Sequence, residues 1–391
     1  MAKQTDTQSV AELAAALVQI ESINPGPAGD DVPGPRERDV SQYVYDWLSG
    51  RGMKAERREF LPGRFNVTAV AAGSGPKRLM VDAHMDTIPT EAMDIEPLSG
   101  EIRDGRVWGR GAVDDKGTLA AMMWALASLV ESGVTPPATI ELLASGDEEG
   151  GFRGIRDWVA QGGMADGAIV GEASELGLIT ASRGAVRFKV RTRGKPVHTC
   201  SPEKGINAVT HMARVLAAIE DDLKPKMLAR THPLLDGPRI TPAMINGGRR
   251  ANIVPDECVI DIDRRVLPCE TKESALAEFD AMVERVAATD DTMTIERLEA
   301  YSFVPAAECS ADDPLVAASA AALAGENLST EVLGVPYTTH ASVTAEAGIP
   351  TITIGPGSIE QAHGPVEYVD IDQLEAAARI YRGIFETYGA H

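Results

Sequence analysis

Residues 78–87 read RLMVDAHMDT, an apolar, β-forming stretch followed by a polar loop that opens with His84. A short apolar run bounded by polar residues is typical of a buried strand. Upstream, FNVTAVAA from Phe65 predicts a second strand, and downstream an Ala- and Met-rich segment over residues 117–132 predicts a helix. This part of the chain therefore alternates between strand and helix.

The alternation extends in both directions along the chain. Toward the C-terminus we expect a helix near Asp312, a buried strand PTITIG and a long helix from Ile371. The other elements predicted outside the middle of the chain are helices over 10–20, 37–50 and 153–161 and strands over 139–145 and 168–172. Such alternation predicts an α/β fold with a mostly parallel sheet and helices on both faces.

The pattern changes in the middle of the chain, between Gly184 and Arg297. Strand, helix, strand, strand, helix and strand are predicted in turn over 185–193, 205–223, 239–246, 257–266, 271–288 and 292–298. This β-α-β-β-α-β order is that of a ferredoxin-like unit. We therefore expect a catalytic domain in two parts, residues 1–183 and 299–391, with a second domain inserted over 184–298 as a hinged lid.

Composition and charge limit the partners of the chain. Its 391 residues carry a formal net charge of −21, which argues against a surface for nucleic acid, because phosphate binding needs clustered Lys and Arg. The same charge does not suit an anionic membrane. A small-molecule substrate is the expected partner. The acidic excess could serve solubility, and a site that holds two dications would also use several carboxylates.

The cysteines and the N-terminus indicate a cytoplasmic protein. Four cysteines lie far apart without a CxxC pair, so neither a thiolate zinc site nor a redox motif is expected: Cys200, Cys258, Cys269 and Cys309. The first 20 residues lack the unbroken apolar stretch of a secretory signal, and no run of 18 apolar residues occurs.

Acidic and imidazole side chains follow the predicted strands at the point where each strand ends. His84 and Asp86 come directly after strand 78–83, and residues two apart in an extended segment share a face, so Asp86 could orient His84. Glu172 ends the strand in VGEAS, and His363 follows the Gly355–Gly357 turn. Because ligands bind beyond the carboxyl ends of strands in open α/β sheets, these side chains could converge.

Two further motifs have both a structural and a functional interpretation. In GRGAVDDKG, Asp114 could bridge two metal ions, but Asp114 or Asp115 could equally cap the helix that follows, and the glycines could hold a phosphate. In SGDEEGG, Glu148 and Glu149 could be a solvated loop, or one could ligate metal while the other accepts a proton from water.

Histidines outside these motifs are interpreted as structural: His211, His232 and His391. The case for a site depends on the conjunction of nitrogen and oxygen donors without sulfur, which suits zinc, cobalt or manganese. These donors are His84, Asp114, Glu149, Glu172 and His363.

Five motifs, in this order along the chain, resemble those of one family of dizinc hydrolases. They are H-x-D, G-R-G-x-x-D-x-K-G, D-E-E-G, G-E and A-H-G-P-x-E. The family contains aminoacylase, acetylornithine deacetylase, succinyl-diaminopimelate desuccinylase and glutamate carboxypeptidase. The resemblance spans nearly the whole chain, from the first helix and the INP turn to the last helix. It implies a zinc-exopeptidase-like fold and hydrolysis of the amide C–N bond of an N-acyl amino acid or small peptide.

The resemblance also implies a role for each site residue. His84 and Glu172 would hold one metal ion, Glu149 and His363 the other, and Asp114 both. Asp86 would orient His84, and Glu148 would be the general base on a water that bridges the metals.

In the inserted domain, similarity implies a lid that forms a homodimer. His198 matches a histidine that reaches the partner subunit's site and stabilises the oxyanion, and Arg265 matches an arginine that grips a substrate carboxylate. Arg265 could also be an ordinary surface residue, since Arg264 stands beside it. Asn252 would contact substrate, and Asn207 could have a role in the site or simply cap a helix. Gly357 would line the pocket.

The sequence departs from the family pattern at two positions. Thr339-His340-Ala341 stands where many relatives have T-D-A, and Val366 replaces an Asn or Asp before Glu367. His340 could therefore contact the substrate or cap a helix. These departures keep open an alternative activity on an amidine, ureido or aryl amine bond. A non-catalytic binding protein of the same ancestry would require a lost ligand or base, and neither loss is seen.

Overall fold

The structure is a computed structural model that describes residues 8–26 and 37–390. Its contacts divide the chain into two units. The first comprises Met1–Thr180, Glu308–Leu333 and Thr339–His391, and the second comprises Ala181–Ala307 and Gly334–Thr338. The short return of residues 334–338 to the second unit has no counterpart in the sequence pattern.

The largest sheet confirms the expected α/β fold. Its strands run in the order β1-β2-β6-β3-β7-β16-β8-β14, and β15 pairs with β8. The strands are β1 (Lys54–Leu61), β2 (Arg64–Ala71), β3 (Arg78–His84), β6 (Thr139–Ser145), β7 (Gly167–Val170), β8 (Leu178–Ser182), β14 (Ala307–Glu308), β15 (Val332–Val335) and β16 (Thr351–Thr353). The four central strands β6, β3, β7 and β16 are parallel, whereas β1 pairs antiparallel with β2, β2 with β6, and β8 with β16.

Helices cover both faces of this sheet. Leu79, Val81 and Ala83 of β3 belong to the main hydrophobic core with residues of α1, α3 and α10, so Asp82 and His84 face the opposite side. The helices of the first unit are α1 (Val10–Val18), α2 (Arg38–Gly50), α3 (Lys116–Glu131), α4 (Arg153–Ala160), α8 (Pro314–Gly325), α9 (Ala341–Glu346) and α10 (Ile371–Thr387). Helices α4 and α9 contact each other and strands β2, β7 and β16.

Local signals explain several of these boundaries. Ser9 and Glu12 form a capping box at the start of α1, and the Asp313 side chain accepts a hydrogen bond from Leu315 N at the start of α8. A small third sheet of β17 (Tyr368–Asp370), β5 (Arg106–Trp108) and β4 (Glu101–Arg103) was not expected from the sequence.

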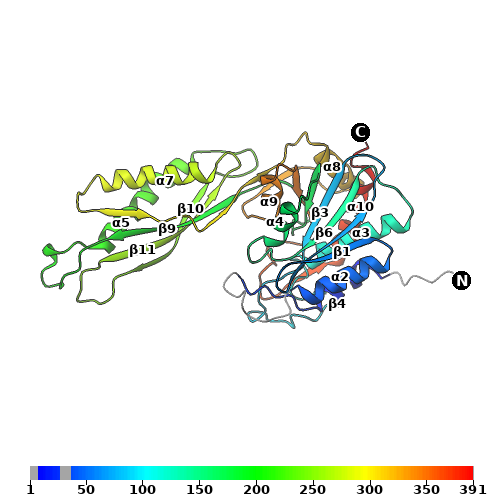
Figure 1. Ribbon diagram of the computed structural model, residues 1–391, viewed down its shortest axis with the longest axis horizontal. Coiled ribbons are helices and arrows are strands. Elements are labelled where there is room, and N and C mark those ends of the chain that lie inside the picture. The colour runs from blue at the N-terminus through cyan, green and yellow to red at the C-terminus, as the bar shows by residue number, and fades with distance from the viewer. Residues whose placement is uncertain (1–7, 27–36, 391) are drawn as a thin grey trace. The chain divides into compact units, whose positions relative to one another are not determined.

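The second unit has the predicted β-α-β-β-α-β order (Figure 1). Its antiparallel sheet runs β10-β11-β9-β12, with β13 also paired to β9. The elements are β9 (Gly184–Arg193), a 3-10 helix (Pro202–Lys204), α5 (Ala208–Ala218), a π-helical turn (Ile219–Leu223), α6 (Lys224–Leu228), β10 (Arg239–Gly247), β11 (Glu257–Val266), α7 (Lys272–Ala287), β12 (Thr294–Arg297) and β13 (Ser302–Val304). Asn207 caps α5 by accepting a hydrogen bond from Thr210 N.

One face of this second sheet is apolar and carries both helices. Phe188 of β9 meets Phe279 of α7 with ring centroids 4.9 Å apart, within a core that includes Ile260 of β11 and Met212 of α5. Among the described residues, no helix is both long and apolar enough to cross a membrane.

Candidate metal centre

The predicted ligands come together beyond the carboxyl ends of the central parallel strands. His84 is the last residue of β3, and the loops after β6 and β7 carry Glu149 and Glu172. Asp114 lies just before α3. All four lie in the first unit, as does His363. Their convergence therefore follows from the parallel pairing of strands that are distant in sequence.

Two groups of ligand atoms share Asp114. In the first, one ligand atom each from His84, Asp114 and Glu172 lie within 4.8 Å of one another, and in the second the same holds for Asp114, Glu149 and His363. The Asp114 Oδ1 atom is 2.9 Å from His84 Nε2, while Oδ2 is 3.2 Å from His363 Nε2. The two carboxylate oxygens of Asp114 thus face different histidines, as a bridging ligand requires.

The chemistry of the donors fits two divalent cations. Nitrogen and oxygen atoms without sulfur suit zinc, cobalt or manganese. His84, Asp114 and Glu172 are buried, and buried carboxylates are costly unless a cation or hydrogen bonds compensate them. Both triads use residues that the sequence marked as ligands.

The pKa values of the candidate ligands and of Glu148 reflect the number of carboxylates that lie close together. Burial raises the pKa of Glu148 and of Glu172 well above the usual range, and Asp114 adds to both effects. Hydrogen bonds to Asp114 and Glu149 raise the pKa of His363 to about 10. Burial opposes the shift at His84, but hydrogen bonds to Asp114 and Asp86 raise its pKa well above the usual value. Bound dications would favour the ionised carboxylates.

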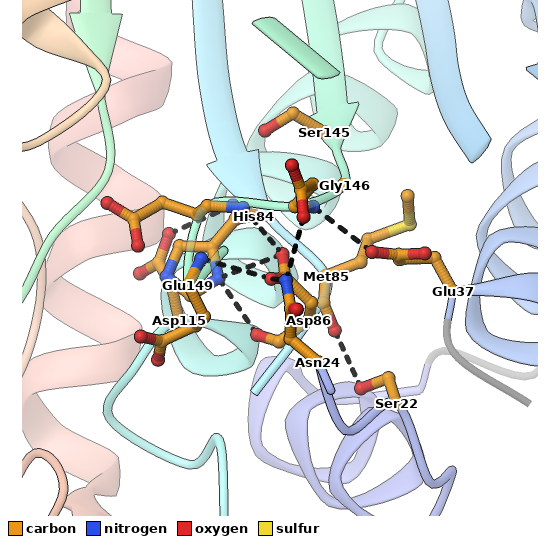
Figure 2. A network of polar contacts seen from close by, with 12 residues as sticks. Ser22, Asn24, Glu37, His84, Met85, Asp86, Asp115, Ser145, Gly146 and Glu149 are labelled. Carbon is orange, nitrogen blue, oxygen red and sulfur yellow. Dashed lines mark hydrogen bonds and ion pairs between the residues drawn. The ribbon is translucent and has the colours of Figure 1, made fainter. Parts of the chain in front are cut away.

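Asp86 has further partners besides the expected His84. His84 Nδ1 lies 2.9 Å from the backbone oxygen of Asp86 and 3.7 Å from its carboxylate, so the main chain provides the close contact. The carboxylate accepts hydrogen bonds from the backbone nitrogen of Glu149 at 3.1 Å and from Asn24 Nδ2 at 2.7 Å (Figure 2). It also accepts one from the backbone nitrogen of Glu148 at 3.0 Å. Asp86 therefore holds the turn that carries Glu148 and Glu149.

Further residues support the ligands without having been assigned from the sequence. Glu367 Oε1 accepts hydrogen bonds from the backbone nitrogens of Val113 and Asp114, and its other oxygen pairs with Arg110. Glu367 belongs to the A-H-G-P-x-E motif. The motif indicated that this residue matters, but not that it binds the backbone beside Asp114. Asp115 is the N-cap of α3, but its side chain does not cap the helix, and Oδ2 lies 3.3 Å from His84 N.

Two expected substrate contacts in the first unit are not supported by their surroundings. His340 is 1% exposed, and its Nδ1 lies 2.7 Å from Asp82 Oδ2, so the ring is an internal group. It precedes α9 without a side-chain capping bond. The Gly357 N–H donates to Gln373 Oε1 at 2.7 Å, and is therefore already used within the protein. Gly357 has a φ of +81°, and a Cβ there would meet Val113 at 2.3 Å.

The other expected contacts lie in the second unit. His198 is exposed, and its Nδ1 lies 3.3 Å from Cys200 N, which leaves Nε2 as the protonated nitrogen of the neutral ring. Arg265 is partly exposed and pairs with Asp263, whereas Arg264 is fully buried between Glu270 and Glu278. Asn252 is exposed and its backbone oxygen accepts from Thr199 N.

The histidines interpreted as structural have internal partners. His211 is buried with Nε2 3.8 Å from an Asp290 oxygen, and His232 Nδ1 accepts from the backbone nitrogens of Leu234 and Leu235. His391 lies outside the described residues.

Comparison with known proteins places these features in a family context. The model of peptidase family M20/M25/M40 matches residues 80–387. The acetylornithine deacetylase of Proteus mirabilis is 31% identical over 390 residues, covering 96% of each chain. That of Aliivibrio fischeri is 30% identical over 351 residues, covering 88% of this chain and 89% of the relative.

Solved structures show the same fold across nearly the full length. A tripeptidase from Staphylococcus aureus aligns with a TM-score of 0.80 at 19% identity, covering 98% of this chain and 99% of its own. A dinuclear metal-binding peptidase from Bacillus subtilis aligns with a TM-score of 0.73 at 14% identity, covering 96% of each chain.

Proposed function

The chain belongs to peptidase family M20/M25/M40, a family of amide-bond hydrolases, and on that premise we propose that it cleaves an N-acyl amino acid or small peptide with two bound metal ions. The observation that carries this proposal is the sharing of Asp114 between two triads of ligand atoms. The relatives named acetylornithine deacetylase favour an acetylated amino acid as the substrate.

The proposed mechanism assigns binding and proton transfer to separate residues. His84 and Glu172 would hold one ion, Glu149 and His363 the other, and Asp114 both. When bound, zinc, cobalt or manganese would polarise the scissile carbonyl and make a nearby water more acidic. Glu148 takes a proton from the attacking water and returns it to the leaving amine nitrogen.

Two residues of the second unit complete the proposed mechanism. His198 donates from Nε2 to the oxyanion of the tetrahedral intermediate, a role consistent with the contact of its Nδ1 to Cys200 N. Arg265 binds the substrate carboxylate, and its partial exposure supports this role better than the burial of Arg264 would. Asn252 is a further candidate contact because it is exposed.

We further propose that the chain is a cytoplasmic homodimer formed through the inserted unit. Strand β10 lies at the edge of its sheet, and Met244 and Ile245 on this strand are 60% and 56% exposed. An exposed apolar edge strand is a natural template for pairing with another chain. All four cysteines are free thiols, in keeping with a reducing compartment.

The alternative of an amidine, ureido or aryl amine substrate has lost part of its support. It depended on the departures at His340 and Val366, and the His340 ring is buried against Asp82.

The substitution Glu148→Gln tests the proposed proton transfer. It should lower kcat by about 10²–10⁴-fold, the usual contribution of a positioned acid–base group, while metal content stays that of the wild type. The substrates are acetyl-, succinyl- and formyl-amino acids and dipeptides, assayed with zinc, cobalt or manganese and with a chelator. Glu175→Gln, at an exposed glutamate of a nearby loop, is the control. A fully active Glu148→Gln enzyme would refute the assignment.

A further inference from the structure

His340 occupies a buried position at the start of α9, where three segments of the first unit meet its ring. Nδ1 lies 2.7 Å from Asp82 Oδ2 on β3 and 3.3 Å from Ser145 Oγ at the end of β6. The ring also packs edge-to-face on Phe152, with centroids 5.0 Å apart. No substrate contact is needed to explain a histidine with these neighbours.

The contact with Asp82 reaches the strand that carries a metal ligand. Asp82 and His84 are two residues apart on β3, so their side chains share one face of the sheet. Asp82 and His340 are each 1% exposed, and an ionised carboxylate is acceptor-only, so Nδ1 donates the hydrogen bond. Within the described residues, Asp82 Oδ1 and His340 Nε2 have no hydrogen-bond partner. This bond is therefore the main polar compensation available to Asp82.

The other two contacts flank the turn of the proposed general base. Ser145 precedes that turn and Phe152 follows it, while Glu148 and Glu149 lie between them. Asp86 holds the same turn from the side of β3 through the backbone nitrogens of Glu148 and Glu149. The His340 ring thus contacts both ends of the segment whose middle Asp86 fixes.

We propose that His340 is a positioning residue of the metal centre. By donating Nδ1–H to Asp82 and packing between Ser145 and Phe152, it fixes the end of β3 and the 145–152 loop relative to each other. This arrangement sets the spacing of His84 from Glu149. The inference rests on the proposed function only in taking those two residues as metal ligands.

Two amide substitutions at His340 separate this role from simple packing. The amide nitrogen of asparagine can occupy the place of Nδ1, whereas that of glutamine reaches the place of Nε2. His340→Asn should therefore retain the bond to Asp82 and keep zinc affinity within about threefold of the wild type. His340→Gln should weaken zinc affinity by about 10–100-fold, the usual effect of losing a residue that orients metal ligands. If packing alone mattered, the larger glutamine would be the better replacement.

Zinc affinity is measured by competition with a chromophoric chelator, with no substrate present. Ser342→Ala is the matched control, because Ser342 is fully buried in the same helix and its hydroxyl has no partner among the described residues. It should leave zinc affinity unchanged. Equal losses for the asparagine and glutamine variants, no loss in either, or a greater loss for asparagine would each overturn the proposal.

Asp82→Asn keeps the inference testable if the His340 variants do not fold. It removes the acceptor charge but leaves the histidine in place, and it should weaken zinc binding by about 10-fold or more. Unchanged zinc affinity in a folded Asp82→Asn protein would contradict the proposed positioning. This readout needs no turnover, so it is independent of the Glu148→Gln experiment. If the zinc affinities of the His340 variants follow the expected order but Glu148→Gln is active, only the assignment of Glu148 as the base is refuted.

Discussion

Arg264 and Arg265 are neighbours on β11 with opposite surroundings, and their substitution should have opposite effects. Arg264 is fully buried, with Nη2 2.7 Å from Glu270 and 2.8 Å from Glu278. Arg264→Ala removes one of two arginines that pair with the buried Glu270 carboxylate, the other being Arg230 at 3.0 Å, so the free energy of unfolding should fall by about 1–3 kcal/mol, measured by urea denaturation. The KM of the surviving folded enzyme should change little.

Arg265→Ala should give the reverse result. The side chain is partly exposed and pairs with Asp263 on its own strand, a contact worth about 1 kcal/mol or less. Stability should therefore stay close to that of the wild type, while KM for a substrate with a free carboxylate rises by about 10-fold or more, since a charged hydrogen bond is lost. An unchanged KM in steady-state assays would remove Arg265 from the substrate site.

At the residue scale, the candidate ligands were easier to predict from the sequence than the residues that support them. His84, Asp114 and Glu149 could be proposed as ligands because the metal chemistry restricts ligands to a few residue types at strand ends. The actual direction of a supporting side chain depends on loop geometry. Asp86 therefore contacts the 148–149 turn as well as His84, and His340 faces Asp82, a partner 258 positions away.

At the element scale, Glu37 at the start of α2 makes stability depend on pH. Its carboxylate accepts from Arg64 Nη1 at 3.1 Å and from Asp147 N at 3.1 Å. Burial, followed by the nearby Asp86, raises the pKa of Glu37 from 4.5 to about 8. Between pH 4.5 and about pH 8 the folded state keeps a proton on Glu37 that the unfolded state has lost. The free energy of unfolding should therefore fall as pH rises through this range.

Glu37→Gln should remove much of that pH dependence. Glutamine mimics the protonated carboxyl, so the variant should match the wild type near pH 5 and be more stable near pH 8, by an amount on the order of a few kcal/mol. Urea denaturation at both pH values measures the difference. Glu56→Gln, at an exposed position of β1, is the control. A variant that declines with pH as steeply as the wild type would show that Glu37 does not titrate in this range.

The elements that the sequence predicted are those with a clear apolar pattern. Strands β3, β6 and β7 are buried apolar runs, and their parallel pairing at the centre of the sheet was expected. Strand β1 reads KAERREFL and lies at the sheet edge, where charged residues replace the apolar run, so it was missed. The three-residue strands β4, β5 and β17 are too short to give a periodic signal.

At the scale of the whole molecule, the proposed dimer makes a prediction about how two subunits share one reaction. If His198 acts in the site of the partner subunit, each active site takes Glu148 from one chain and His198 from the other. Glu148→Gln and His198→Ala then damage contributions that come from different chains. Each variant alone should be nearly inactive, with His198→Ala lowering kcat by about 10²–10³-fold as for other oxyanion donors. Neither substitution touches the exposed β10 edge, so both proteins should still form dimers.

Mixing the two variants under conditions of subunit exchange should restore activity. About half of the dimers would then be mixed, and each mixed dimer would contain one site with both defects and one with neither, giving about a quarter of wild-type kcat. A third protein, Ile245→Arg, places a charge on the exposed β10 strand and should be monomeric by light scattering and unable to complement. If the mixture stays as inactive as its components although exchange is demonstrated with tagged chains, His198 serves its own subunit or none.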